Sequence, residues 1–166
     1  MILRVLTALA LAIGLSGCFG RPDAPPAYTG PEVTSIVVYK ERHKLYLMHD
    51  DQVMKSYDIA LGFNPVGHKQ FEGDGKTPEG TYFIDWLHPN SQYHRALRVS
   101  YPNAQDRAYA ASQGRSPGGD IFVHGGPKGR ADPDTDWTAG CIAVRDEEIE
   151  EIYSMVRPGT PIFIYP

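Results

Sequence analysis

The sequence lacks several features that would each fix a class of protein. It has two cysteines in 166 residues, too few for a disulfide-stapled scaffold or a four-thiolate zinc site. Its net charge is -4 and its lysines and arginines are scattered among acids, so no nucleic-acid partner is expected. No internal repeat, nucleotide-binding glycine pattern or HExxH motif occurs. These absences leave one globular domain of ordinary size.

The chain also has little long apolar sequence, and its one notable run lies at the N-terminus. Residues 1–17 carry one charge at Arg4, then an apolar run too short for a membrane span, then small residues, which indicates a secretory signal peptide. The run ends in Leu-Ser-Gly-Cys at 15–18, which resembles the lipobox of bacterial lipoproteins and implies cleavage before Cys18 and its acylation. The alternative is an ordinary signal peptide with a chance cysteine. Phe19 replaces the aspartate of inner-membrane retention, which favours the outer membrane.

The segment after the signal peptide is rich in proline and glycine. Residues 18–31 have no apolar period, so we expect a lipidated cysteine followed by an extended tether. The folded domain is then expected at residues 32–166. With the lipid on Cys18, the chain is predicted to lie in the cell envelope, on the periplasmic side, held to a membrane.

Short β-branched and aromatic runs dominate the expected domain, which predicts a mainly β fold. A helical period of apolar residues follows Asp146, the expected N-cap, and Arg-Pro-Gly at 157–159 ends it. A second helix is expected within residues 103–114. The predicted strands are 33–40, 44–50, 52–62, 80–86, 96–101, 121–124 and 161–166.

Cys141 ends a glycine-rich stretch, Ile-Phe-Val-His-Gly-Gly to Thr-Ala-Gly-Cys-Ile-Ala-Val, at residues 121–144. If Cys18 carries lipid, Cys141 has no disulfide partner in an oxidising compartment, and it is either a buried passenger or a reactive thiol. Gly140 before it permits a sharp turn, which favours the reactive thiol. A thiolate needs a nearby base or positive charge.

Six histidines are candidates for that base. His124 fits best, because an apolar strand carries it to a sheet edge and two glycines follow it. His68, in Gly-His-Lys, is retained as a candidate substrate contact. The others are expected in turns and loops, exposed or without metal-type spacing: His43, His49, His88 and His94.

These residues resemble the L,D-transpeptidase catalytic domain of the YkuD type. That family carries a histidine, a spacer and Ser/Thr-His-Gly-Cys. Here His124 and Gly125 precede a loop that ends in Thr138-x-Gly140-Cys141. The subgroup with this reduced Thr-x-Gly-Cys motif is the nearest match.

An earlier segment agrees with the resemblance. Gly-Asp-Gly-Lys-Thr-Pro-Glu-Gly-Thr-Tyr-Phe-Ile at 73–84 is similar to the family's lysine-threonine-proline-x-glycine stretch, which leads into a strand. The resemblance covers about residues 33–166. It implies a β-sandwich of mixed strands with one or two short helices.

The resemblance also implies a chemistry. Cys141 would be the nucleophile that attacks a peptide carbonyl of peptidoglycan and forms an acyl-enzyme, and His124 the base. The Gly125 carbonyl would orient the imidazole, and amides near Gly140 and Cys141 would hold the oxyanion. Neither a cofactor nor a metal is implied. The partners would be peptidoglycan and, through Cys18, a membrane; protein partners are not predicted.

Two alanines depart from the family motif and leave the reaction open. Ala139 stands where a second histidine is usual, and Ala143 where arginine or asparagine is usual. Neither missing side chain is the base, so thiol chemistry is retained, whether for crosslinking or for lipoprotein attachment and remodelling. A site without acceptor-holding groups would favour hydrolysis, as in related enzymes proposed to release a wall-linked lipoprotein. A catalytically silent, lipid-anchored wall-binding module is the third interpretation.

Two further groups of residues have weaker interpretations. Trp137 and Thr138 are candidate substrate contacts, although Trp137 could equally pack on the core. The alternating acids Asp132, Asp134 and Asp136 suggest calcium less strongly than solvated turns, because the later EF-hand positions are missing.

Overall fold

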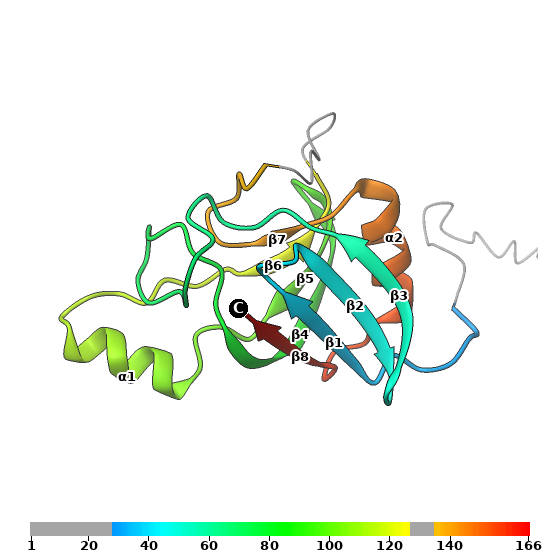
Figure 1. Ribbon diagram of the computed structural model, residues 1–166, viewed down its shortest axis with the longest axis horizontal. Helices are drawn as coiled ribbons and strands as arrows, with labels where there is room; N and C mark the ends of the chain where they lie inside the picture. The colour runs from blue at the N-terminus through cyan, green and yellow to red at the C-terminus, as the bar shows by residue number, and fades with distance from the viewer. Residues whose placement is uncertain (1–27, 127–134) are drawn as a thin grey trace, which may run out of the picture.

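The computed structural model describes residues 28–126 and 135–166 (Figure 1). The signal peptide and Cys18 with most of the tether therefore lie outside the described residues, and their predicted roles stay predictions. The described elements are β1 (Ser35–Tyr39), β2 (Lys44–His49), β3 (Gln52–Asp58), β4 (Gly80–Ser91), β5 (His94–Val99), α1 (Ala104–Ser112), β6 (Phe122–His124), β7 (Ile142–Ala143), α2 (Asp146–Met155) and β8 (Pro161–Tyr165). No described helix has the length and apolar content to cross a membrane.

The strands form one mixed sheet in the order β3-β2-β1-β8-β4-β5-β6-β7. The last strand of the chain, β8, lies in the middle, parallel to β1 and antiparallel to β4. The sheet curls so far that its ends meet: Ala60, just after β3, exchanges backbone hydrogen bonds of 2.9 and 2.8 Å with Ala143 of β7. The predicted mainly β fold is confirmed, and one curled sheet makes both faces of the sandwich.

The side chains on the inner face of the strands fill the space inside the curled sheet. In β1 and β2, every second residue is buried, including Ile36, Val38, Leu45 and Leu47, each with no exposed surface. The outward residues of these strands are mostly polar or aromatic. This period of two is what a sheet with one covered face requires.

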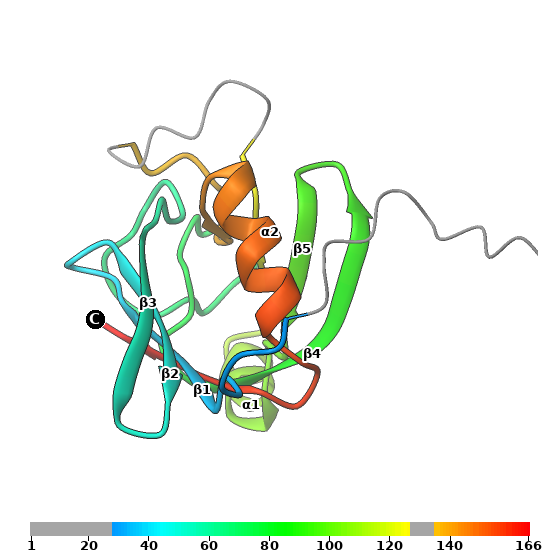
Figure 2. The ribbon, with the colours of Figure 1, turned by 90° about the vertical axis from the view of Figure 1, so that its right-hand side faces the viewer.

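Helix α2 closes the remaining opening of the curl (Figure 2). Ile149 and Ile152 are fully buried, Glu151 accepts a hydrogen bond from Tyr57 of β3, and Glu150 pairs with Arg95 of β5. The helix thus joins both halves of the sheet. It begins at Asp146, so the expected N-cap was wrong by one residue: Arg145 takes that position, because Glu148 reaches back to its amide.

The predicted loop around His88 and His94 was also wrong. His88 lies within β4 and His94 begins β5, and these two strands form a hairpin whose register shifts between His88 and Ser91. Pro89 lies in that irregular stretch, where a missing amide donor is tolerated. The proline and its polar neighbours therefore indicated a loop where the strand continues.

The helix predicted within residues 103–114 is present as α1.

Candidate active site

The two ends of the glycine-rich stretch lie on neighbouring strands. β6 and β7 run parallel, with Val123 beside Ile142 and His124 beside Ala143. Cys141 is therefore level with Phe122 and shares the sheet face of His124, because side chains two residues apart point the same way. Strand spacing and rise place the Cα atoms of His124 and Cys141 about 8 Å apart.

The His124 ring is fixed by its own neighbour. Nδ1 lies 2.5 Å from the Gly125 carbonyl oxygen, so Nδ1 donates and Nε2 is left as the acceptor. A side chain at Gly125 would have no room, since its Cβ would lie 2.5 Å from Asp146 Oδ1 and 3.0 Å from the Tyr93 carbonyl oxygen. The Asp146 carboxylate also accepts the Gly126 amide at 3.1 Å. The start of α2 therefore holds the backbone that orients the imidazole.

Two aromatic rings enclose the imidazole. Tyr93 stacks on His124 with centroids 4.6 Å apart and planes at 24°, and Trp137 meets it edge-on at 5.8 Å. His124 is only 3% exposed. Burial lowers the pKa of His124, and the Gly125 hydrogen bond only partly opposes this. The resting imidazole is thus neutral and ready to accept a proton.

The Cys141 thiol is also neutral at rest. Its Sγ points to the Asp120 carbonyl oxygen at 3.4 Å. Burial raises the pKa of Cys141 and the Asp120 charge adds to this, while the Phe122 amide and the Lys69 ammonium work against it. With the thiol and the imidazole both neutral, the two groups form no standing ion pair.

The Thr138–Cys141 turn is held by the threonine hydroxyl. Thr138 Oγ1 donates to the Cys141 carbonyl at 2.7 Å and accepts from the Gly140 amide at 3.1 Å. Thr138 is buried and its hydroxyl is engaged, so the structure gives it a role in the turn, while its substrate contact stays a prediction. The Gly140 amide is occupied by its hydrogen bond to Thr138 Oγ1, whereas the Cys141 amide bonds to no described residue. Among the described residues, the Cys141 amide is therefore the donor of this turn that stays available to an acceptor.

Gly140 is required by both conformation and space. Its φ is +136°, and a Cβ there would lie 2.6 Å from the Lys76 carbonyl oxygen. Lys76 and Thr77 belong to the Lys-Thr-Pro stretch that resembles the family motif. Thr77 is fully buried and its hydroxyl accepts the Gly62 amide at 3.1 Å. This stretch thus supports the turn that carries Cys141.

An ion pair between Lys69 and Asp74 holds the first part of the loop at residues 62–79. Lys69 Nζ lies 2.8 Å from Asp74 Oδ1, and the Asp74 carboxylate also accepts the amides of Gln70, Phe71 and Lys76. Burial alone would raise the pKa of Asp74, but these bonds outweigh it and lower the pKa to about 2. The loop is therefore held by a carboxylate that stays ionised.

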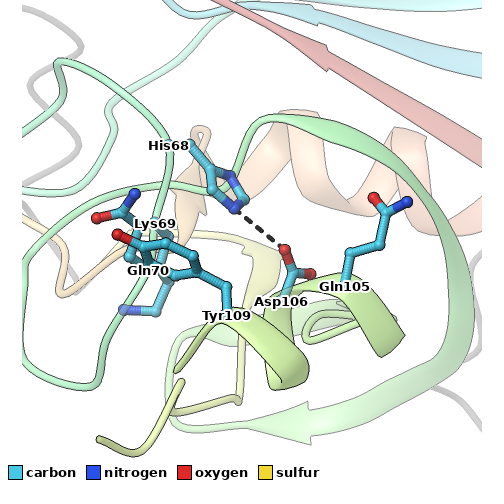
Figure 3. Close-up of a pocket in the computed structure, with 6 residues that line it drawn as sticks. All are labelled: His68, Lys69, Gln70, Gln105, Asp106 and Tyr109. Carbon is cyan, nitrogen blue, oxygen red and sulfur yellow. Dashed lines mark hydrogen bonds and ion pairs between the residues drawn. The ribbon is translucent and has the colours of Figure 1, made fainter. Parts of the chain in front are cut away.

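His68 lies in a side pocket rather than against His124 (Figure 3). Its Nδ1 accepts the Glu79 amide at 2.9 Å, and its Nε2 lies 3.1 Å from Asp106 Oδ1. Lys69 also lines this pocket. The predicted substrate contact of His68 stays a prediction.

Asp136 holds the segment before Trp137. Its carboxylate lies 3.1 Å from His43 Nε2 and accepts the Leu61 amide at 2.7 Å. Asp132 and Asp134 lie outside the described residues. Among residues 28–126 and 135–166, no three acidic, histidine or cysteine side chains gather to hold a metal.

Sequence reasoning missed Tyr93 as part of the site, and it gave Asp136 only a turn or, less strongly, a calcium ligand. Tyr93 stands in a hairpin turn far from the motif. No pattern in the sequence links Tyr93 to His124. Only the pairing of β5 with β6, which sets Ala96 beside His124, brings the hairpin to the imidazole.

A sequence profile of the YkuD L,D-transpeptidase catalytic domain matches residues 33–164. The chain belongs to this L,D-transpeptidase family. The predicted resemblance is thereby confirmed. The Escherichia coli K12 protein named "Putative L,D-transpeptidase YafK" is 31% identical over 144 residues, covering 79% of this chain and 53% of YafK.

Solved structures agree on the L,D-transpeptidase fold. Pgp2 of Campylobacter jejuni, titled a helical cell shape determining protein, is 27% identical with a TM-score of 0.62, over 88% of this chain and 51% of Pgp2. An L,D-transpeptidase from Mycobacterium smegmatis is 18% identical with a TM-score of 0.56, over 81% of this chain and 59% of that one, and shows the fold alone. The chain spans about half the length of YafK and of Pgp2.

Proposed function

We propose that this L,D-transpeptidase domain acts on peptidoglycan stem peptides through an acyl-enzyme on Cys141. The observation that carries the proposal is the orientation of His124. Its Nδ1 is fixed on the Gly125 carbonyl, and its ring shares a sheet face with the Cys141 thiol. A thiol and an oriented base on one face are what nucleophilic acyl transfer requires.

In the first half-reaction, Cys141 Sγ attacks the carbonyl carbon of a stem peptide bond. The thiol proton passes to His124 Nε2, and the carbonyl oxygen becomes an oxyanion held by the Cys141 amide. One such donor lowers the barrier by about 3 kcal/mol. When the C–N bond breaks, His124 returns its proton to the leaving amine and a thioester is left on Cys141.

In the second half-reaction, an acceptor attacks the thioester. His124 takes a proton from the acceptor amine, the C–S bond breaks, and the Cys141 thiolate recovers a proton from His124. An acceptor amine from a second stem or from a lipoprotein lysine gives a new amide, whereas water gives a free acid. Both routes regenerate the same thiol.

Hydrolysis is a second candidate outcome of the same acyl-enzyme. Ala139 is exposed in the turn and Ala143 is buried against Ala60, so neither position offers a polar side chain to hold an acceptor amine. Water needs no such group. These two alanines are the observation that favours release of a wall-linked lipoprotein over crosslinking.

We also propose that the chain works in the cell envelope. A signal peptide at residues 1–17 would direct the chain to the periplasm, which is the compartment that contains peptidoglycan. A lipid on Cys18 would hold the domain to a membrane, and Phe19 favours the outer membrane. These assignments rest on sequence.

The first test is trapping of the acyl-enzyme. Incubation with a carbapenem should add one adduct to the wild-type chain by intact-mass spectrometry, located on Cys141 by peptide mapping. Cys141→Ala should give none, and His124→Gln should acylate about 10² to 10⁴ times more slowly, since the base is lost. A folded wild-type chain that never acylates would favour the wall-binding module.

Incubation with purified sacculi then separates the two acyl acceptors. New 3-3 crosslinks, or attachment of a lipoprotein, would identify a transpeptidase. Released lipoprotein without crosslink gain would identify a hydrolase. Cys141→Ala is the control for both readouts.

A further inference from the structure

We propose that the pocket between the loop at residues 62–79 and helix α1 binds an uncharged sugar ring of the peptidoglycan glycan strand. The inference deepens the proposed function and rests on it. The pocket has a volume of about 210 Å³ and lies apart from the His124 ring and its aromatic enclosure. Figure 3 shows the loop side chains facing those of α1. We call it the α1 pocket; it is lined by His68, Lys69, Gln70, Gln105, Asp106 and Tyr109.

The charges in the α1 pocket are already paired. Lys69 is bonded to Asp74 and to the Phe71 carbonyl at 2.8 and 3.0 Å. Asp106 is bonded to His68 at 3.1 Å, and its second oxygen accepts from Tyr82 Oη and from a backbone amide. A charged ligand would find no unpaired partner here. The pocket therefore selects an uncharged ligand.

The groups that remain available are neutral. Within the described residues, the side-chain amides of Gln70 and Gln105 and the hydroxyl of Tyr109 have no hydrogen-bond partner. Amides both donate and accept, which suits hydroxyl and acetamido groups. Tyr109 is 44% exposed and its ring rests on Phe71 at 5.9 Å, so it offers a supported flat face. Neutral hydrogen bonding beside an aromatic face is how proteins hold a pyranose ring.

The α1 pocket is connected to the nucleophile by its loop. Lys69, in the loop at residues 62–79, lines the pocket. The Tyr101 hydroxyl lies 3.5 Å from the Lys69 carbonyl oxygen and 3.0 Å from that of Pro117. The chain from Pro117 leads to Asp120, whose carbonyl faces the Cys141 thiol. Tyr101 and the segment 117–120 thus join the pocket loop to the backbone that Cys141 Sγ faces.

The alternative occupant is the stem peptide itself. Stem peptides carry carboxylates and amines, and these would require the unpaired charges that the α1 pocket lacks. The glycan strand is uncharged around each ring apart from its lactyl link to the stem. The paired charges and the exposed ring together favour sugar over peptide.

The test measures sugar binding without turnover. Full-length Cys141→Ala protein is titrated with tetra-N-acetylchitotetraose, a soluble and uncharged oligomer of N-acetylglucosamine, and binding is followed by calorimetry. We expect saturable binding that Gln105→Ala and Tyr109→Ala, each added to this protein, weaken by at least about fivefold, since each removes a hydrogen bond or a ring contact. Gln113→Ala, at the exposed end of the same helix, is the matched control and should bind as before.

Three results would overturn the inference. The first is no binding of tetra-N-acetylchitotetraose. The second is equal binding by the Gln105→Ala, Tyr109→Ala and Gln113→Ala variants. The third is competition for the pocket by a free stem tetrapeptide. Unchanged circular dichroism of the variants keeps the comparison valid. Because Cys141→Ala cannot acylate, these results are independent of carbapenem trapping. A chain that acylates but fails this test keeps its proposed function and loses only the sugar subsite.

Discussion

At the residue scale, burial decides the resting protonation state of the candidate pair, His124 and Cys141. The pKa of His124 is lowered by burial and that of Cys141 is raised by burial, so both groups are neutral before substrate arrives. The sequence named both residues from their motif. It did not name Tyr93, whose ring covers the imidazole, because contact between a hairpin turn and a strand end leaves no local pattern.

Tyr93→Leu should raise the pKa of His124 toward its ordinary value. The change removes the stacked ring and lets water reach the imidazole, which favours its charged form. An NMR titration of the His124 ring protons measures the shift. Tyr93→Phe keeps the stack and is the control. An equal titration in Tyr93→Leu and wild type would show that the ring does not set the pKa.

At the element scale, period and composition were enough to find most strands and both helices. The hairpin of β4 and β5 was the main error, since Pro89 and its polar neighbours indicated a loop. The turn that carries Cys141 shows a second limit of prediction from sequence. Gly140 was predicted to allow a sharp turn, but the contact with the Lys76 carbonyl that demands glycine comes from a distant loop.

Gly140→Ala should disrupt this turn and abolish acylation. Its Cβ would meet the Lys76 carbonyl, and its φ of +136° is unfavourable for alanine, so we expect a loss of about 3 kcal/mol in the free energy of unfolding. Gly73→Ala is the matched control, because Gly73 has a φ of +77° and nothing within 4 Å of a Cβ. Its cost should be about 1 kcal/mol, with acylation retained. Urea denaturation and carbapenem trapping measure both, and equal effects of the two changes would contradict the steric argument.

At the scale of the whole molecule, the curled sheet brings the segment after β3 against β7. Lys76 of the loop at residues 62–79 lies against Gly140 of the turn that carries Cys141. This loop depends on Asp74, whose carboxylate accepts hydrogen bonds from the Lys69 ammonium and from three backbone amides. Stability of the fold is thereby linked to pH. The folded pKa of Asp74 is about 2, below its ordinary 3.8.

Because that pKa is lowered by folding, the Asp74 contribution is present above about pH 4 and is lost as the pH falls toward 2. The shift corresponds to roughly 2 kcal/mol of the free energy of unfolding. Asp74→Asn should therefore be less stable than wild type at pH 7, and the difference should shrink at pH 3. Urea denaturation at both values measures it, with the exposed Asp51→Asn as control. A difference that is the same at both pH values would rule out the ionised carboxylate as its cause.

The sequence by itself determined the mainly β class, the candidate pair His124 and Cys141, and the family, because periodicity and motifs are local. Tertiary structure decided what surrounds them: the aromatic enclosure of His124, the engaged Gly140 amide and the α1 pocket with His68. Each of these joins segments that are distant in the chain. Their contacts arise from the curl of the sheet and the pairing of β5, β6 and β7, which depend on how the whole chain packs.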